Sequence, residues 1–184
     1  MPTRDVWVIA TRRKPSRRAI RATYLRFING AVKAIDLVNA YFVPDWRIRR
    51  ALIRAVGRGV RVRVMVPEVG DLRFVQWAVE GTLERLVRGG VQAFAYRQSV
   101  LHSKTAVVDD RLVTIGSYNL DNRSFRFNLE VNLAVRSVAF ADVVRDSIER
   151  DLKMCTPWTT EVLLARGVFR RIMSWVALLF ARFL

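Results

Sequence analysis

Three strand-like segments, each preceded by a helical pattern, place the strongest constraint on the fold of this chain. The clearest one alternates valine with arginine or methionine from Val60 to Val66 and is closed by Pro67. Apolar runs predict two further strands, at residues 37–43 and 91–96. Apolar residues at helical spacing precede the three strands, over residues 16–35, 46–56 and 71–88. This alternation predicts an α/β fold, a mixed sheet flanked by helices on both faces.

The second half of the chain adds more strands and a helical tail. A hairpin of two strands, a third strand and a helix are expected at residues 104–108, 112–115, 129–135 and 139–154. Ser16 and Asp45 are the expected N-caps of two earlier helices. We therefore expect an N-terminal stub and basic linker (1–15), with a short strand at 6–10, one α/β domain (16–156) and a C-terminal apolar and basic tail (157–184).

Basic residues outnumber acidic ones, 32 Lys and Arg against 16 Asp and Glu, which gives a formal net charge of +16. Such a charge favours anionic partners, such as nucleic acid, anionic lipid or a phosphorylated substrate. An ordinary solvated basic surface is the alternative. The N-terminus carries no convincing secretory signal, which favours a cytoplasmic or cytoplasm-facing protein.

Cysteine and histidine usage limits the kinds of site that one copy of the chain can build. Cys155 is the only cysteine, which excludes an internal disulfide and a cysteine-based zinc site. His102 is the only histidine, which excludes a site with several histidine ligands in one chain. We expect neither a metal nor an organic cofactor.

Residues 102–119 combine side chains suited to a phosphate diester. On the expected hairpin, His102 and Lys104 point to one face, and Ser117 and Asn119 share the same spacing. Lys104 can neutralise a phosphate oxygen, and Ser117 and Asn119 can donate further hydrogen bonds. His102 can attack phosphorus or protonate the leaving oxygen. Asp109, at the turn, is better placed to hold the loop through backbone amides than to do chemistry.

Taken singly, these residues have ordinary explanations, such as a half-buried histidine, a solvated lysine and a turn. Their combined spacing, His102-x-Lys104-x4-Asp109-x6-Gly116-Ser117-x-Asn119, resembles the signature of the phospholipase D superfamily. Three further segments, at residues 39–44, 120–124 and 128–132, resemble bacterial cardiolipin synthases. The whole likeness extends from about residue 17 to residue 153. The chain is thus similar to the C-terminal half of such a synthase.

The resemblance implies a role for each residue of the signature. His102, Lys104 and Asp109 would be catalytic, with a phosphohistidine intermediate. Lys104, Ser117 and Asn119 would bind the substrate phosphate, with Gly116 in support. Glu130 matches the downstream acid that orients an imidazole across the interface between two halves. Without the resemblance Glu130 would be a solvated strand residue, since Glu130 and Asn132 alternate with Leu129, Val131 and Leu133.

The chain departs from the resembling enzymes in carrying a single motif. Those proteins have two motifs in one chain, and the reaction uses one histidine as nucleophile and one as acid. We expect either a homodimer or a separate first half encoded elsewhere. In two-motif relatives the first-half histidine is the usual nucleophile, so His102 would be the acid of a second half, or take both roles in a homodimer.

The expected function is phosphatidyl transfer between glycerophospholipids, with an anionic phospholipid substrate, peripherally at the cytoplasmic side of a membrane. Two alternatives stay open: a homodimeric nuclease of the same superfamily acting on DNA, and a non-catalytic half with a structural or membrane-binding role.

The apolar tail at 172–181, flanked by Arg170, Arg171 and Arg182, is shorter than the roughly 20 residues of a spanning helix. It suits a helix in the membrane interface or a helix packed on a protein surface.

Overall fold

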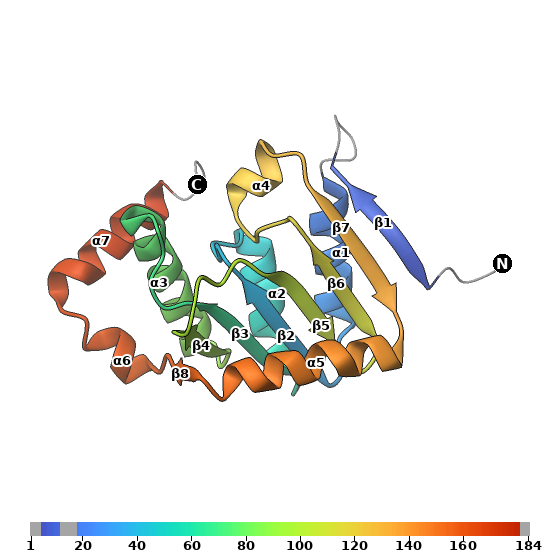
Figure 1. Ribbon diagram of the computed structural model, residues 1–184. Coiled ribbons are helices and arrows are strands. Elements are labelled where there is room, and N and C mark those ends of the chain that lie inside the picture. The colour runs from blue at the N-terminus through green and yellow to red at the C-terminus, as the bar shows by residue number, and fades with distance from the viewer. Residues whose placement is uncertain (1–4, 12–17, 181–184) are drawn as a thin grey trace.

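In the computed structural model, which describes residues 5–11 and 18–180, eight strands form one sheet (Figure 1). Their order is β1-β7-β6-β5-β2-β3-β4-β8. The strands are β1 (Val6–Ala10), β2 (Ala34–Asn39), β3 (Arg61–Pro67), β4 (Gln92–Tyr96), β5 (Lys104–Val108), β6 (Leu112–Gly116), β7 (Val131–Arg136) and β8 (Cys155–Pro157). The helices are α1 (Ala19–Gly30), α2 (Trp46–Gly57), α3 (Arg73–Arg88), α4 (Asn122–Arg126), α5 (Val138–Leu152), α6 (Thr160–Leu164) and α7 (Val168–Leu179).

The sheet is mixed, as predicted. Strands β2, β3 and β4 are parallel, and the remaining pairs are antiparallel. Three parallel strands place their carboxyl ends, and the loops that follow them, at one edge. Strand β5 runs the other way, so its first residue, Lys104, pairs with Asn39, the last residue of β2. Residues that are far apart in the sequence therefore meet at this edge.

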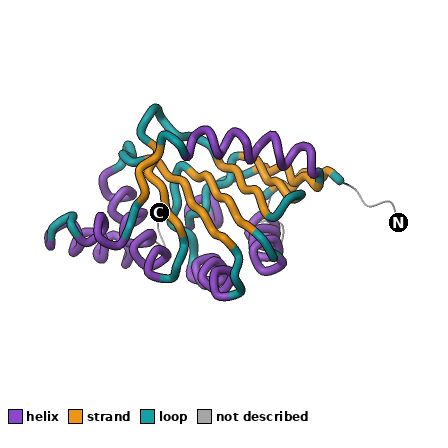
Figure 2. Tube along the Cα trace, turned by 90° about the horizontal axis from the view of Figure 1, so that it is seen from below, coloured by secondary structure: helices purple, strands orange, loops and turns teal. Residues whose placement is uncertain are grey.

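Helices cover both faces of the sheet, as predicted (Figure 2). The larger core lies on the face of α1, α2 and α3, and includes Leu37, Leu52, Val64 and Leu83. On the other face, α5 packs Ala141 and Ile148 against a smaller cluster. Arg63 crosses that face between two carboxylates, 2.6 Å from Asp36 Oδ1 and 2.6 Å from Glu149 Oε1. The pairing with Arg63 allows a charged residue, Asp36, in the middle of a buried strand.

Several predicted element boundaries are confirmed and others are wrong. Asp45 caps α2 by accepting hydrogen bonds from Arg47 N and Ile48 N. Helix α1 ends at Gly30 rather than at residue 35, because Ala31 turns extended and Ile35 enters β2. Strand β2 ends at Asn39 rather than at residue 43. Beyond it the chain leaves the sheet, and Val43 N donates to Leu120 O. Ser16 lies outside the described residues.

The C-terminal segment folds back onto α3. Helix α7 lies against Gly81, where an added Cβ would come within 2.8 Å of Leu178 Cδ1. The guanidinium of Arg170 donates to both oxygens of buried Glu80, at 2.6 and 2.9 Å. The outer side of α7 leaves Phe169, Ile172 and other apolar side chains exposed. No helix in residues 5–11 and 18–180 is long and apolar enough to cross a membrane, and residues 181–184 of the predicted tail fall outside these ranges.

Candidate active site

Lys104 carries a buried positive charge at the edge where β2 ends and β5 begins. The side chain is 6% exposed, and its Nζ donates to His102 O at 2.7 Å. Among the described residues, no carboxylate lies within ion-pair distance of this ammonium. Burial lowers the pKa of Lys104, and the more distant charges of Glu130 and Asp121 oppose that shift. An anionic ligand would supply the charge partner that the fold leaves out.

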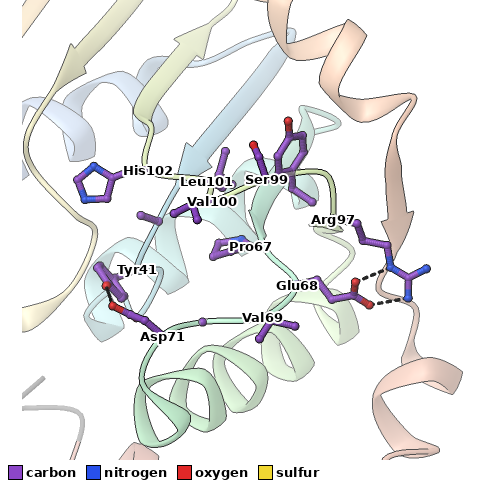
Figure 3. Close-up of a pocket in the computed structure, with 13 residues that line it drawn as sticks. Tyr41, Pro67, Glu68, Val69, Asp71, Arg97, Ser99, Val100, Leu101 and His102 are labelled. Atoms are coloured by element: carbon purple, nitrogen blue, oxygen red, sulfur yellow. Dashed lines mark hydrogen bonds and ion pairs between the residues drawn. The ribbon is translucent and has the colours of Figure 1, made fainter.

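His102 lies in the segment between β4 and β5, where its imidazole is exposed. It forms part of the wall of a cavity of about 460 Å³ (Figure 3). The other residues of that wall follow β2, β3 and β4, so the cavity opens at the same edge as Lys104. The imidazole is therefore accessible to a ligand in this cavity.

Asn119 faces a second cavity, of about 240 Å³, together with Asp121, Arg123 and Asn128. Its Oδ1 is buried, and among the described residues it has no hydrogen-bond partner. Buried polar atoms are nearly always hydrogen-bonded, so an unpaired one at a cavity calls for an explanation. Tyr41 contributes to the walls of both cavities and therefore lies between the regions of His102 and Asn119.

Ser117 and Glu130 form a separate hydrogen-bonded group. The hydroxyl of Ser117 donates to Glu130 Oε2 and accepts from Val131 N at 3.0 Å. Asn128 Nδ2 donates to the other oxygen, Glu130 Oε1, at 3.1 Å. Ser117 is therefore committed to Glu130 in this structure. To donate to a phosphate, as the resemblance implies, its hydroxyl would have to leave Glu130.

Gly116, the last residue of β6, packs so closely against β7 that only glycine fits at this position. A Cβ at this position would lie 2.2 Å from Val131 O and 2.6 Å from Asn132 Cα. No side chain fits there without moving the neighbouring strand, and Ser117 N donates to the same Val131 O at 3.0 Å. Gly116 thus supports the site by letting β7, and with it Glu130, approach the signature segment closely.

Asp109 does not join the other signature residues. It follows the last residue of β5, about 17 Å along an extended strand from Lys104. Its carboxylate accepts hydrogen bonds from the backbone amides of Val32, Lys33 and Ala34, at 2.8 to 3.2 Å. These contacts match the loop-holding role predicted from the residues. They argue against Asp109 touching substrate, as a catalytic member of the signature would.

Two buried asparagines that carried no role in the sequence analysis hold the 117–120 segment. Asn39 Oδ1 accepts from Leu120 N at 3.2 Å. Asn132 Oδ1 accepts from Tyr118 N at 3.3 Å, and its Nδ2 donates to Thr114 Oγ1 at 2.9 Å. An amide among the apolar residues of a predicted strand is the signal that could have identified both, because such a group needs a partner once it is buried.

Comparisons with known proteins identify a matching family and several similar sequences. The family model described as "Cardiolipin synthase, PLD-like domain" matches residues 24–152. A cardiolipin synthase from Clostridium perfringens strain SM101 is 35% identical over 153 residues, which cover 83% of this chain and 32% of that protein. Cardiolipin synthase A from Pseudomonas entomophila is 41% identical over 138 residues, covering 75% and 29%. The chain thus spans about a third of the length of these relatives.

Solved structures of low sequence identity share the fold. The phospholipase D family member Nuc from Salmonella typhimurium superposes with a TM-score of 0.72 at 22% identity, covering 84% of this chain and 97% of that one. Phosphatidylserine synthase from Haemophilus influenzae superposes with a TM-score of 0.73 at 16% identity, covering 97% of this chain and 48% of that one. Because the family model matches most of this chain, the chain belongs to the family of cardiolipin synthase, phospholipase D-like domains.

Proposed function

We propose that this chain supplies one of the two half-sites of a phosphatidyltransferase of cardiolipin-synthase type. Such an enzyme moves a phosphatidyl group from one glycerophospholipid to a hydroxyl of another. The observation that carries the proposal is the buried ammonium of Lys104, which lacks a carboxylate partner among the described residues and lies beside accessible His102. A phosphodiester places a negative oxygen and an electrophilic phosphorus at such a pair.

The chemistry proceeds in two displacements at phosphorus. In the first, an imidazole nitrogen attacks, a P–N bond forms, and the P–O bond to the leaving alcohol breaks as that oxygen takes up a proton. In the second, the hydroxyl of the acceptor attacks, its proton passes to a base, and the P–N bond breaks. Lys104 and the amide of Asn119 would bind the phosphate oxygens. One imidazole cannot hold phosphorus and deliver the proton together, so a second imidazole is needed.

An uncovered apolar area supports a partner that would bring that second imidazole. Glu130, just before β7, and Asn132 and Ala134 of that strand turn inward, whereas Leu129 (76% exposed), Val131 and Leu133 lie outside. In the sheet register, Leu133 pairs with Val8 of β1 and Ile115 of β6, which are also exposed. Such a patch beside Ser117 and Glu130 suits a protein interface. The partner is a second copy of this chain or a separately encoded first half.

The proposed location is the cytoplasmic surface of a membrane, where the chain would bind peripherally to anionic phospholipid. The exposed side chains of α7, Phe169 and Ile172 among them, and the net charge of +16 support that location. Flotation with vesicles of anionic lipid tests it. Phe169→Ser together with Ile172→Ser should weaken binding, while Val32→Ser, an equally exposed position elsewhere, should leave binding unchanged. Equal flotation of both variants would rule out α7 as the anchor.

A nuclease acting as a homodimer is the second candidate. It is favoured by the net charge of +16 and by the match to 97% of the Nuc chain, which indicates that a single unit of this size can stand as one protein. The two candidates share one site and differ in substrate, so an assay on both substrates separates them.

The deciding experiment measures phosphatidyl transfer on phosphatidylglycerol vesicles and cleavage of single- and double-stranded DNA, at several protein concentrations with sedimentation in parallel. We expect transfer that rises with the dimer fraction and disappears in His102→Ala, while Ser103→Ala, an exposed neighbour, retains it. Cleavage of DNA without transfer would favour the nuclease. Inactivity on both substrates at every concentration would exclude an active homodimer, and would leave a half that needs a separately encoded partner or a non-catalytic half.

A further inference from the structure

The cavity beside His102 differs in chemistry from the region of Lys104. Its volume of about 460 Å³ falls within the range of roughly 300–1,000 Å³ that is typical of small-ligand pockets. Figure 3 shows His102 on one side, Tyr41 and Asp71 below it, and Glu68 with Arg97 at the far side. Apart from His102, Arg97 is the only basic residue among those that line the cavity, and Lys104 and Asn119 are not part of the lining.

The polar groups of this lining accept hydrogen bonds rather than attract anions. Tyr41 Oη donates to Asp71 Oδ2 at 2.7 Å. That bond raises the pKa of Tyr41 to about 12, and the phenol is protonated at neutral pH, as an ordinary tyrosine also is. Because the phenol O–H already donates its hydrogen bond to Asp71, Tyr41 Oη can only accept a hydrogen bond from a ligand. The second oxygen of Asp71 can accept one as well.

The other charged pair of the lining is neutralised internally. Both oxygens of Glu68 accept from the guanidinium of Arg97, one of them at 2.6 Å from Nη2. Arg97 therefore offers little net attraction to a second phosphate, and the unpaired charge that remains in the lining is the carboxylate of Asp71. A phosphate would be repelled here, whereas a hydroxyl group would find acceptors.

Apolar residues complete the cavity and reach its mouth. Pro67 and Leu101 lie in the wall, and Val69 and Val100, the latter 90% exposed, stand at the surface. A free alcohol in water would gain little from this apolar rim. In an intact lipid, the glycerol and acyl chains attached to the headgroup would cover the apolar rim.

Resting on the transferase function proposed above, we propose that this cavity binds the headgroup of the accepting lipid, an uncharged headgroup rich in hydroxyls, with Tyr41 and Asp71 as its specificity-determining residues. Because Tyr41 also lines the cavity of Asn119, a hydroxyl hydrogen-bonded to Tyr41 lies between His102 and the phosphate region. From there its oxygen attacks phosphorus, the P–N bond to the histidine breaks, and the hydroxyl proton passes to the base.

The test compares Tyr41→Phe and Asp71→Asn with the wild type in the assembly that is active in transfer. The acceptors are short-chain phosphatidylglycerol and, separately, short-chain phosphatidylethanolamine. Release of the first alcohol from the donor lipid, in a rapid-quench burst, reports the step before the acceptor is used. Asp110→Asn removes an equal charge at the opposite end of β5 and serves as the control.

Both variants should keep the burst of the wild type, raise the KM for phosphatidylglycerol about tenfold, and shift products from transfer toward hydrolysis by water. The control should change none of these. An unchanged KM and transfer-to-hydrolysis ratio, with the burst intact, overturns this inference alone, as does an effect confined to the ammonium-bearing phosphatidylethanolamine. A wild type that shows neither burst nor transfer overturns the proposed function itself.

Discussion

At the amino end of β5 the ammonium of Lys104 is buried beside a carbonyl oxygen, whereas at the carboxyl end the carboxylate of Asp109 accepts hydrogen bonds from three consecutive backbone amides. One charge is left without a charge partner among the described residues, and the other is fully used by the fold. We therefore propose that Lys104 binds the ligand and that Asp109 holds the turn. Residues that share one sequence signature can therefore divide between a site and the scaffold that holds it.

The largest effect is expected at the site end. Lys104→Met removes the charge and keeps most of the stem, so phosphatidyl transfer should fall by roughly 10²–10³, the usual loss for one preorganised charge partner. The melting temperature should stay the same or rise, because a desolvated ammonium has been removed. Steady-state transfer and thermal unfolding measure the two quantities. Transfer above a tenth of the wild-type rate would place Lys104 outside the chemistry.

At the turn end the order of effects should reverse. Asp109→Ala leaves three amides without their partner and places alanine at a φ of 53°. We expect a loss of about 2 kcal/mol in the free energy of unfolding, or roughly 4–8 °C in melting temperature. Transfer per folded molecule should stay within about twofold.

Asp109→Asn is the matched control for that substitution, because asparagine keeps an acceptor oxygen and tolerates a positive φ. It should lose less stability than Asp109→Ala. If Asp109→Ala instead abolished transfer in a fully folded protein, the division between site and scaffold would be refuted.

A smaller effect concerns pH. Burial lowers the pKa of Lys104, so the unliganded ammonium loses its proton at a lower pH than an ordinary lysine, whose pKa is about 10.4. A bound anion favours the charged form, so affinity is highest where the ammonium keeps its proton and falls as pH rises through the lowered pKa. Calorimetry with sulfate between pH 7 and 10 measures this fall, since the charge of sulfate is constant there. A wild-type profile identical to that of Lys104→Met would contradict it.

The smallest effect is expected from the exposed pair of Lys33 and Asp110 at the turn. Exposed ion pairs contribute little because water and salt screen them. Lys33→Ala should leave both the melting temperature and transfer unchanged within error, whereas Asp109→Ala should not. A clear destabilisation by Lys33→Ala would show that surface charge, rather than the Asp109 carboxylate, fixes the turn.

The sequence was sufficient to predict the α/β class and β5 itself, because alternation and turn residues are local signals. It was insufficient for the end of α1, since Ile35 fits the helical spacing and the strand that follows. Without the resemblance, the prediction of a solvated Glu130 was also wrong, because Glu130 is 4% exposed. Alternation separates Glu130 and Asn132 from Leu129 and Val131, but only the packing of Asn132 against Tyr118 and Thr114 turns the polar side inward.

The site was predictable to the extent that it follows the signature. Strand spacing predicts that His102 and Lys104 point to one face, but His102 precedes β5 and lines a cavity that Lys104 does not line. No local pattern indicates that Ser117 is hydrogen-bonded to Glu130, thirteen residues away. Nor does it indicate the cavity, whose walls come from loops after three different strands. Contacts between distant segments depend on the register of the whole sheet.

The hydrogen bonds from the backbone amides of residues 32–34 to Asp109, here called the Asp109 clasp, also constrain the order in which the chain can fold. The two segments are separated by 75 to 77 positions, and α2, β3, α3 and β4 lie between them. The hairpin of β5 and β6 can close by itself quickly, since its contacts are local. Its turn gains its hydrogen-bond donors only after β2 and β5 have paired across that long loop, which is a slow event because of the entropy of loop closure. Substitutions at Asp109 should therefore alter the unfolding rate more than the folding rate, because the clasp forms late.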